Sequence, residues 1–88
     1  MRKGMDMKQE EALLWIAEIF EEPKENVRPE SLREAIPGFD SMGVLALMAA
    51  LDKDFDLVLT EEDIRTITKV GDILQILERN GKLETGAA

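Results

Sequence analysis

One serine in the chain stands where a helix is expected to begin. Asp40-Ser41-Met42 follows Gly38 and Phe39 and precedes a long run of helix-forming residues. In the first turn of a helix the backbone N–H groups have no intrahelical partners, and the helix dipole favours negative charge. A hydroxyl at this point is therefore well suited to carry a phosphate ester. We expect Asp40 to cap the helix and Gly38 to let the preceding loop turn sharply.

An Asp-Ser pair is also common at ordinary helix starts, so the pair alone does not decide the function. The rest of the composition narrows the chemistry. The chain has no His and no Cys, which removes the usual general base, every Ser-His-Asp arrangement, disulfides and thiolate metal sites. We find no credible catalytic constellation and predict that the protein is not an enzyme.

An acidic stretch further along the chain has the spacing of a calcium-binding loop. Asp52, Asp54 and Asp56 alternate, and Asp63 lies at the twelfth position, as in an EF-hand. Position six is Leu57, where such a loop needs a glycine, and Asp63 replaces the bidentate glutamate. We therefore predict no metal site.

The balance of charge indicates the kind of partner. The chain carries 19 acidic and 11 basic side chains, a net charge of -8. Nucleic acids and anionic membranes attract clustered Lys and Arg, so we expect neither as a partner. Proteins with basic surfaces fit better, because opposite charges speed their encounter. We expect the protein to be a monomer.

The length of 88 residues favours one domain over residues 1–88, with its core at about residues 6–80 and loose ends. Residues 1–9 are not followed by an apolar stretch of signal type. The longest uncharged run, residues 41–51, is too short to span a bilayer. We therefore expect a cytoplasmic protein.

The first half of the chain predicts one helix followed by a long connection. The helix should run from about Asp6 or Lys8 to Phe20, shortly before Pro23. Its core positions are spaced i, i+3, i+4 and i+7: Leu13, Ile16, Ala17 and Phe20. Trp15 and Ile19 lie beside this stripe, and we expect them to pack under the loop that follows.

Residues 21–39 form the connection, and connections of this length are often functional. Three apolar residues are expected to attach it to the core: Val27, Leu32 and Ile36. Ser31 and Glu34 have the spacing of a capping box, which predicts a single helical turn after Ser31.

The second half of the chain predicts three more helices. The second should cover about residues 41–54, and a short third helix should begin near Thr60, where Asp63 has cap-like spacing. The fourth should cover about residues 70–79, with Val70, Ile73, Leu74 and Leu77 as its core stripe and Asn80-Gly81 as its stop. The strand signal around Leu57 is poor, so we predict an all-α fold.

The second helix has two apolar faces. One is expected to face the core: Val44, Leu47, Met48, Leu51 and Phe55. The other lies on a different side: Met42, Leu45, Ala46 and Ala49. The helix could be central and buried all round. Because the other helices of so small a bundle cover only one face, we interpret the second face as a partner surface.

Several features together resemble the acyl carrier proteins. These are Gly-x-Asp-Ser-Met at residues 38–42, the helix with Leu47, Leu51 and Phe55 behind the serine, the short acidic helix, and Val70-Gly71-Asp72 at the start of the last helix. The order of elements and the long first loop agree as well. The resemblance extends over about residues 10–80.

This resemblance implies a small four-helix bundle in which Ser41 receives 4′-phosphopantetheine from coenzyme A through a separate phosphopantetheinyl transferase. Asp40 would help the transferase handle the site, and Asp40 and Met42 would form the cofactor-binding site together with Ser41. The terminal thiol of the arm would carry acyl groups as thioesters between acyl-transfer and condensing enzymes. Fatty acid, specialised lipid or polyketide biosynthesis would be the setting.

The chain also departs from the family. Carriers of fatty acid synthesis have a strongly acidic exposed face on the second helix, whereas Gly43 and Ala46 are uncharged at the matching positions. We interpret Gly43 as admitting a partner or the arm. Docking by basic or apolar enzyme surfaces is expected to involve seven residues: Met42, Leu45, Ala49, Asp52, Asp54, Glu61 and Glu62.

Two other functions remain as alternatives to the acyl carrier. One is an unmodified helical protein–protein interaction module that uses the same apolar face. The other is a peptidyl or aminoacyl carrier of a nonribosomal system, which would use the same serine.

Overall fold

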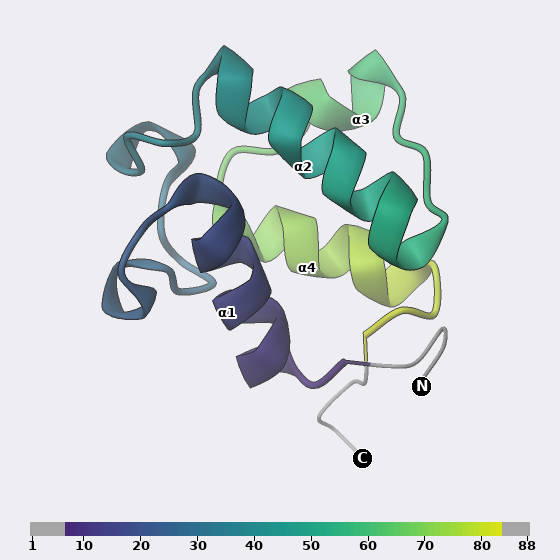
Figure 1. The fold of residues 1–88 in the computed structure, drawn as a ribbon, viewed down its shortest axis with the longest axis horizontal. Helices are drawn as coiled ribbons and strands as arrows, with labels where there is room; N and C mark the ends of the chain where they lie inside the picture. Colours follow the sequence, from purple (N-terminus) through teal and green to yellow (C-terminus); the bar gives the residue numbers. More distant parts are fainter. Residues whose placement is uncertain (1–6, 84–88) are drawn as a thin grey trace.

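A computed structural model describes residues 7–83, and its regular elements are all helical. The α-helices are α1 (Gln9–Phe20), α2 (Ser41–Phe55), α3 (Glu61–Arg65) and α4 (Val70–Arg79) (Figure 1). The connection between α1 and α2 holds two 3-10 helices, η1 (Lys24–Asn26) and η2 (Arg33–Ala35). The predicted all-α fold, with a long first connection and a short third helix, is confirmed.

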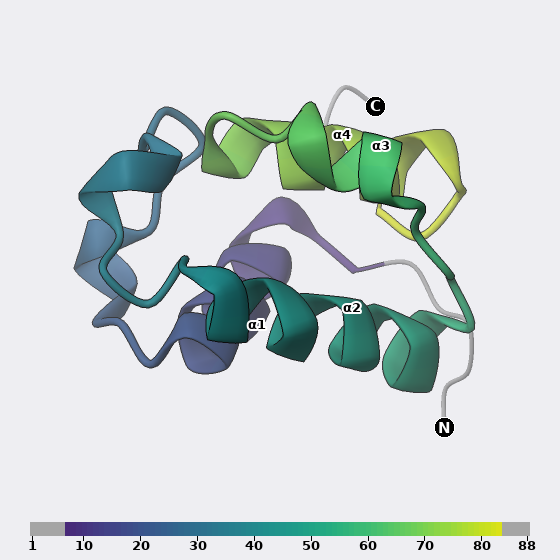
Figure 2. The same cartoon turned by 90° about the horizontal axis from the view of Figure 1, so that it is seen from above.

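The helices enclose a single apolar core. Figure 2 shows α3 and α4 along one side of the molecule and α2 along the opposite side. The ends of the described chain meet in an isolated bridge between Met7 and Leu83. No helix within residues 7–83 has both the length and the apolar character needed to cross a membrane.

The predicted core stripes account for most of the buried side chains. All four predicted residues of α4 are buried, and Ile76 joins them. In α1 Leu13 is only half-buried, whereas the other three predicted residues and Ala12 are buried. The period of apolar residues therefore determined correctly which side of these helices faces inward.

The predicted core face of α2 is buried at its centre and open at one edge. Leu47 and Leu51 are fully buried, and Phe55 is 7% exposed. Val44 and Met48 are only half-buried. Both of these residues border a groove between α2 and α3.

Local hydrogen bonds set the helix boundaries close to the predicted positions. Before α1 the Lys8 N–H donates to Glu11 Oε1 at 3.1 Å. The helix is followed by Glu21, whose left-handed backbone (φ 56°) ends it before Pro23.

The short helix α3 begins at the reciprocal cap that the sequence predicts. Thr60 Oγ1 accepts from the Asp63 N–H, and Asp63 Oδ2 accepts from the Thr60 N–H, both at 3.1 Å. The hydrogen bond that the Thr60 N–H donates to this carboxylate, together with the contact of the Thr60 hydroxyl with it, lowers the pKa of Asp63 from its ordinary value. The helix α4 ends at Asn80 and Gly81, as predicted. Asn80 is its C-terminal cap, and Gly81 has a left-handed backbone with a φ of 72°.

The long connection is attached to the core by two of the three residues predicted for this role. Val27 is 2% exposed and Ile36 is 3% exposed. Leu32 is 49% exposed, so the prediction that it anchors the loop is wrong. Its backbone forms an antiparallel bridge with Lys69, and this bridge joins the loop to the start of α4 in place of the side chain.

The predicted cap of the helical turn in this connection is also wrong. The turn exists as η2, but it begins after Leu32 and has no side-chain cap. Ser31 Oγ instead accepts from the Arg28 N–H at 2.9 Å and donates to the Asn26 carbonyl oxygen at 3.0 Å. The serine therefore closes the turn that precedes it.

Trp15 connects α1 to the C-terminal end of α2 and does not pack under the following loop as expected. Its Nε1 donates to Asp54 Oδ2 at 2.8 Å, and its ring meets Phe55 edge-on with 5.1 Å between centroids. A half-buried indole needs an acceptor for its N–H, and the carboxylate on α2 provides one. Ile19 does lie beside the loop: it lines a depression together with Gly38, which comes shortly before the start of α2.

Candidate functional site

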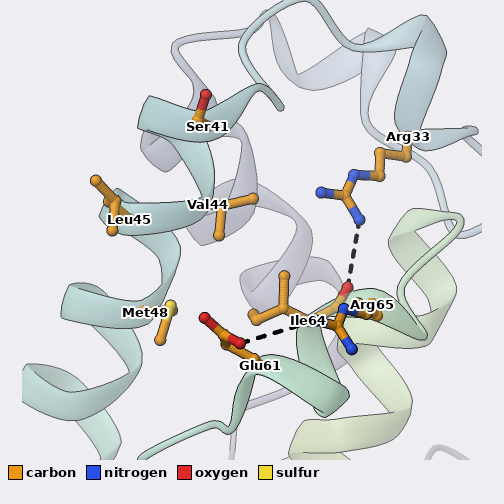
Figure 3. A pocket seen from close by; sticks show the side chains of 8 residues that line it. All are labelled: Arg33, Ser41, Val44, Leu45, Met48, Glu61, Ile64 and Arg65. Carbon is orange, nitrogen blue, oxygen red and sulfur yellow. Dashed lines mark hydrogen bonds and ion pairs between the residues drawn. The ribbon is translucent and has the colours of Figure 1, made fainter.

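Ser41 is the first residue of α2, and its side chain is exposed (Figure 3). Asp40 is the capping residue, as predicted: its Oδ1 accepts from the Gly43 N–H at 3.0 Å, and its carbonyl oxygen accepts from the Val44 N–H at 2.8 Å. Within residues 7–83 the Ser41 hydroxyl has no hydrogen-bond partner. It is therefore free to react with a group brought by another molecule.

The backbone before Ser41 is held by the core. Phe39 is 6% exposed and stacks on Phe20 at the end of α1, with ring centroids 4.5 Å apart and planes inclined by 20°. The Phe39 N–H also donates to the Ile36 carbonyl oxygen at 2.9 Å. This aromatic pair joins the C-terminal end of α1 to the residue two positions before the serine.

Two glycines allow the backbone segments behind Ser41 to approach closely. A Cβ atom at Gly38 would collide with the carbonyl oxygen of Phe20, and one at Gly43 would collide with the carbonyl oxygen of Gly38. Gly43 is buried, so its predicted place on the exposed face is wrong. The missing side chain admits the protein's own loop, and neither a partner nor an arm fits there.

A groove begins at Ser41 and runs between α2 and α3 (Figure 3). Its volume is about 540 Å³. Apolar side chains form its walls: Val44, Leu45 and Met48 from α2, and Ile64 from α3. Charged side chains surround them: Arg33 from η2, and Glu61 and Arg65 from α3. The arrangement offers an apolar surface next to an exposed hydroxyl.

Arg33 is the residue of this site that sequence analysis missed. Its Nη1 donates to the carbonyl oxygens of Ile64 at 3.3 Å and Ile67 at 3.1 Å. Its guanidinium also lies over the Phe39 ring, 4.6 Å from the centroid. The available signal was a cation within the apolar part of the loop, between Leu32 and Ile36.

The second apolar face of α2 is exposed, as predicted. Met42 is 74% exposed and Leu45 is 62% exposed, and Ala46 and Ala49 are exposed as well. Leu45 also lines the groove, whereas Met42 and Ala46 line a second depression on the α1 side of α2, next to Asp40 and Gly38. Apolar side chains therefore flank Ser41 on two sides.

The acidic residues predicted for partner binding are all exposed but do not form one group. Glu61 lies at the groove with Ser41, and Glu62 follows it on α3. Asp52 and Asp54 lie near the other end of α2, and Asp54 accepts the indole N–H of Trp15. Glu61 also pairs with Arg65 at 3.8 Å, and both side chains are exposed. Surface pairs of this kind contribute at most about 0.5 kcal/mol.

Comparison with known proteins places the chain among carriers. It is 33% identical over 73 residues to an acyl carrier protein of Wolinella succinogenes, a match covering 70% of this chain and 96% of that protein. It is 30% identical over 67 residues to an acyl carrier protein homolog of Mycoplasmopsis pulmonis. This match covers 76% of this chain and 90% of that protein.

A shorter match relates the chain to an acyl carrier protein of Bdellovibrio bacteriovorus, at 36% identity over 45 residues, 51% of this chain and 58% of that protein. No family model matches the chain. No solved structure matches it either. The two longer matches each cover most of the relative at 30% identity or more, and the chain belongs to the acyl carrier protein family.

Proposed function

We propose that Ser41 Oγ holds a 4′-phosphopantetheine arm and that the protein carries acyl groups on it. The observation that carries the proposal is the position of Ser41, an exposed hydroxyl on the first residue of α2 at the start of an apolar groove. The shared name of the relatives supports the carrier role. The protein itself would catalyse no reaction.

Attachment requires a separate phosphopantetheinyl transferase. The Ser41 hydroxyl loses its proton and forms a bond to the phosphorus of coenzyme A that bears the pantetheine, and adenosine 3′,5′-bisphosphate leaves. Asp40 occupies the N–H groups of Gly43 and Val44. The other N–H groups of the first turn and the helix dipole would stabilise the phosphodiester.

The arm, when present, supplies a thiol that holds the cargo as a thioester. The residues of the chain would receive the carbon chain of that cargo in the groove beside Ser41. The walls of the groove are apolar, and burying a charged amine there would be costly. An aliphatic acyl group of fatty acid, specialised lipid or polyketide biosynthesis fits these walls better than an aminoacyl group.

Partner enzymes would dock on the side of the molecule that presents Ser41. Met42 and Leu45 offer an exposed apolar surface, continued by Ala49. Glu61 and Glu62 add negative charge on α3 beside it, and Asp52 and Asp54 add negative charge near the other end of α2. We propose that the transferase and the acyl-transfer and condensing enzymes meet this surface with basic or apolar residues of their own.

Intact mass measured before and after incubation with coenzyme A and a broad-specificity transferase tests the proposal. The parent should gain the mass of one phosphopantetheine, and Ser41→Ala should gain none. Ser31 is the other serine of the chain, and its hydroxyl already makes two hydrogen bonds. Ser31→Ala should therefore be modified like the parent. A folded parent that starts without the arm and gains no mass would overturn the proposal.

The exposed apolar face of α2 supports one second candidate, an unmodified interaction module. That function would depend on Met42 and Leu45 and would not require the Ser41 hydroxyl. Partner binding that survives Ser41→Ala but is lost in Leu45→Gln would favour the module over the carrier.

A further inference from the structure

We infer that Arg33 is a positioning residue that holds α3 in place and thereby maintains the groove beside Ser41. Arg33 lines the groove, and its guanidinium points toward Ile64 on α3 (Figure 3). Its Nη1 donates to the carbonyl oxygens of Ile64 and Ile67, at the C-terminal end of α3 and just beyond it. Its guanidinium lies over Phe39, which leads into α2.

Apart from Arg33, α3 is held by its cap at Thr60 and by the buried side chains of Ile64 and, just beyond the helix, Ile67. It has five residues, and Ile64 is the buried one. A helix this short is not stable by its own hydrogen bonds. Within residues 7–83 no hydrogen bond or ion pair connects α3 to α2, and the ion pair of Glu61 with Arg65 is internal to α3. Polar contacts between the two walls therefore do not set the width of the groove.

Through Phe39, Arg33 is in contact with the buried core. Phe39, beneath the guanidinium, stacks on Phe20 of α1. The backbone of Arg33 is fixed as well, because its N–H donates to the Thr68 carbonyl oxygen at 2.9 Å. A planar guanidinium is suited to this place, since it stacks on an aromatic ring and donates to two carbonyls at once. Methionine would keep the unbranched apolar stem of the side chain and lose the charge and the N–H donors.

Amide hydrogen exchange of the unmodified protein tests the positioning role. In Arg33→Met the amides of residues 64–68 should exchange about tenfold faster, because the charge-assisted hydrogen bonds to their segment are lost. Amides of α1 and α4 should change less than those of residues 64–68, and Arg33→Lys should show an intermediate effect. Unchanged exchange at residues 64–68 in Arg33→Met would overturn the inference.

Two controls separate positioning from general loss of stability. Arg28→Met removes an exposed arginine whose Nε donates to the Glu25 carbonyl oxygen at 3.2 Å, outside the groove. It should leave exchange of residues 64–68 as in the parent. Trp15→Phe removes the hydrogen bond to Asp54 and lowers stability without removing the hydrogen bonds of Arg33. It should raise exchange broadly and not selectively at residues 64–68.

The role of the groove rests on the proposed function and needs a second measurement. With the arm attached, the spontaneous hydrolysis of an octanoyl thioester should be severalfold faster in Arg33→Met than in the parent. Hydrolysis of an acetyl thioester should be equal in both, because two carbons are too short to use the groove. Equal octanoyl rates would overturn the link between Arg33 and the groove. A protein that accepts no arm would refute the proposed function, while the exchange measurement would still decide the role of Arg33.

Discussion

Gly43 determines the position of Ser41 although it has no side chain. It lies in the first turn of α2, where helix propensity alone favours alanine by about 1 kcal/mol. The carbonyl carbon of Gly38 would lie 3.0 Å from a Cβ atom at this position, and Phe20 Cδ1 would lie 3.1 Å from it. The loop before Asp40 and Ser41, which contains Gly38, can therefore pack this closely only against a glycine.

Gly43→Ala is expected to destabilise the protein by about 1–3 kcal/mol, because the clash with backbone atoms outweighs the gain in helix propensity. The shifted loop should also slow modification of Ser41. Urea unfolding measures the first effect and intact mass against time measures the second.

Ala46→Gly provides the matched control on the exposed side of the same helix. It should cost about 1 kcal/mol from helix propensity alone and leave the loop in place. If Gly43→Ala were more stable than the parent, the close approach of the Gly38 backbone would not be a constraint in solution.

At the scale of elements, the start of α4 depends on one carboxylate. Asp72 Oδ2 accepts from the Thr68 N–H at 2.8 Å, the Thr68 hydroxyl at 2.9 Å and the Lys69 N–H at 3.3 Å. The hydrogen bond from the Thr68 N–H is the main cause that lowers the pKa of Asp72 from its ordinary value. Since the backbone of residues 68 and 69 also pairs with η2, this carboxylate supports the joint between the loop and the last helix.

The lowered pKa of Asp72 predicts a pH dependence of stability. A carboxylate whose folded pKa lies below its unfolded pKa stabilises the fold fully above the unfolded value of about 3.9, and this contribution is lost as pH falls through the folded value. Asp72→Asn should therefore cost about 1 kcal/mol at pH 7, and its difference from the parent should shrink below about pH 4.

The free energy of unfolding, measured with urea at several pH values, checks this expectation. Glu78→Gln changes an exposed carboxylate on the same helix that accepts no hydrogen bond at the start of α4, and it provides the matched control. A difference between Asp72→Asn and the parent that stayed constant from pH 7 to acid would refute the role of the charged form.

At the scale of the whole molecule, the net charge of -8 produces a field that attracts cationic surfaces. We expect kcat/KM for modification by a basic transferase to fall as salt is added, because screening shortens the range of that attraction. Glu62→Lys, near the groove, should lower kcat/KM severalfold at low salt and weaken its salt dependence.

Glu25→Lys reverses an exposed charge on η1, away from the groove, and makes the same change in net charge. It should lower kcat/KM less than Glu62→Lys does. Equal effects of the two reversals would mean that overall charge steers the encounter and that the surface around Ser41 has no special role in docking.

Much of the fold follows from interactions between near neighbours in the sequence. The core stripes of α1 and α4 have helical spacing, and the Thr60–Asp63 cap is complete within four residues. The exposure of Met42 and Leu45 also followed from their place on a second face of α2. Propensity, periodicity and capping act over a few residues, and these features are readable from the sequence for that reason.

The tertiary structure decided the contacts that join distant parts of the chain. The indole N–H of Trp15 donates to Asp54, which lies 39 positions further along the chain. The guanidinium of Arg33 donates to the carbonyl oxygens of Ile64 and Ile67, 31 and 34 positions further along. Gly43 is buried because the Gly38 loop folds back onto α2. The side chain of Leu32 is exposed, and its backbone instead pairs with Lys69. Such outcomes depend on how whole elements pack, and no local pattern encodes that packing. The sequence by itself thus placed Ser41 at a helix start, and tertiary packing formed the groove beside it.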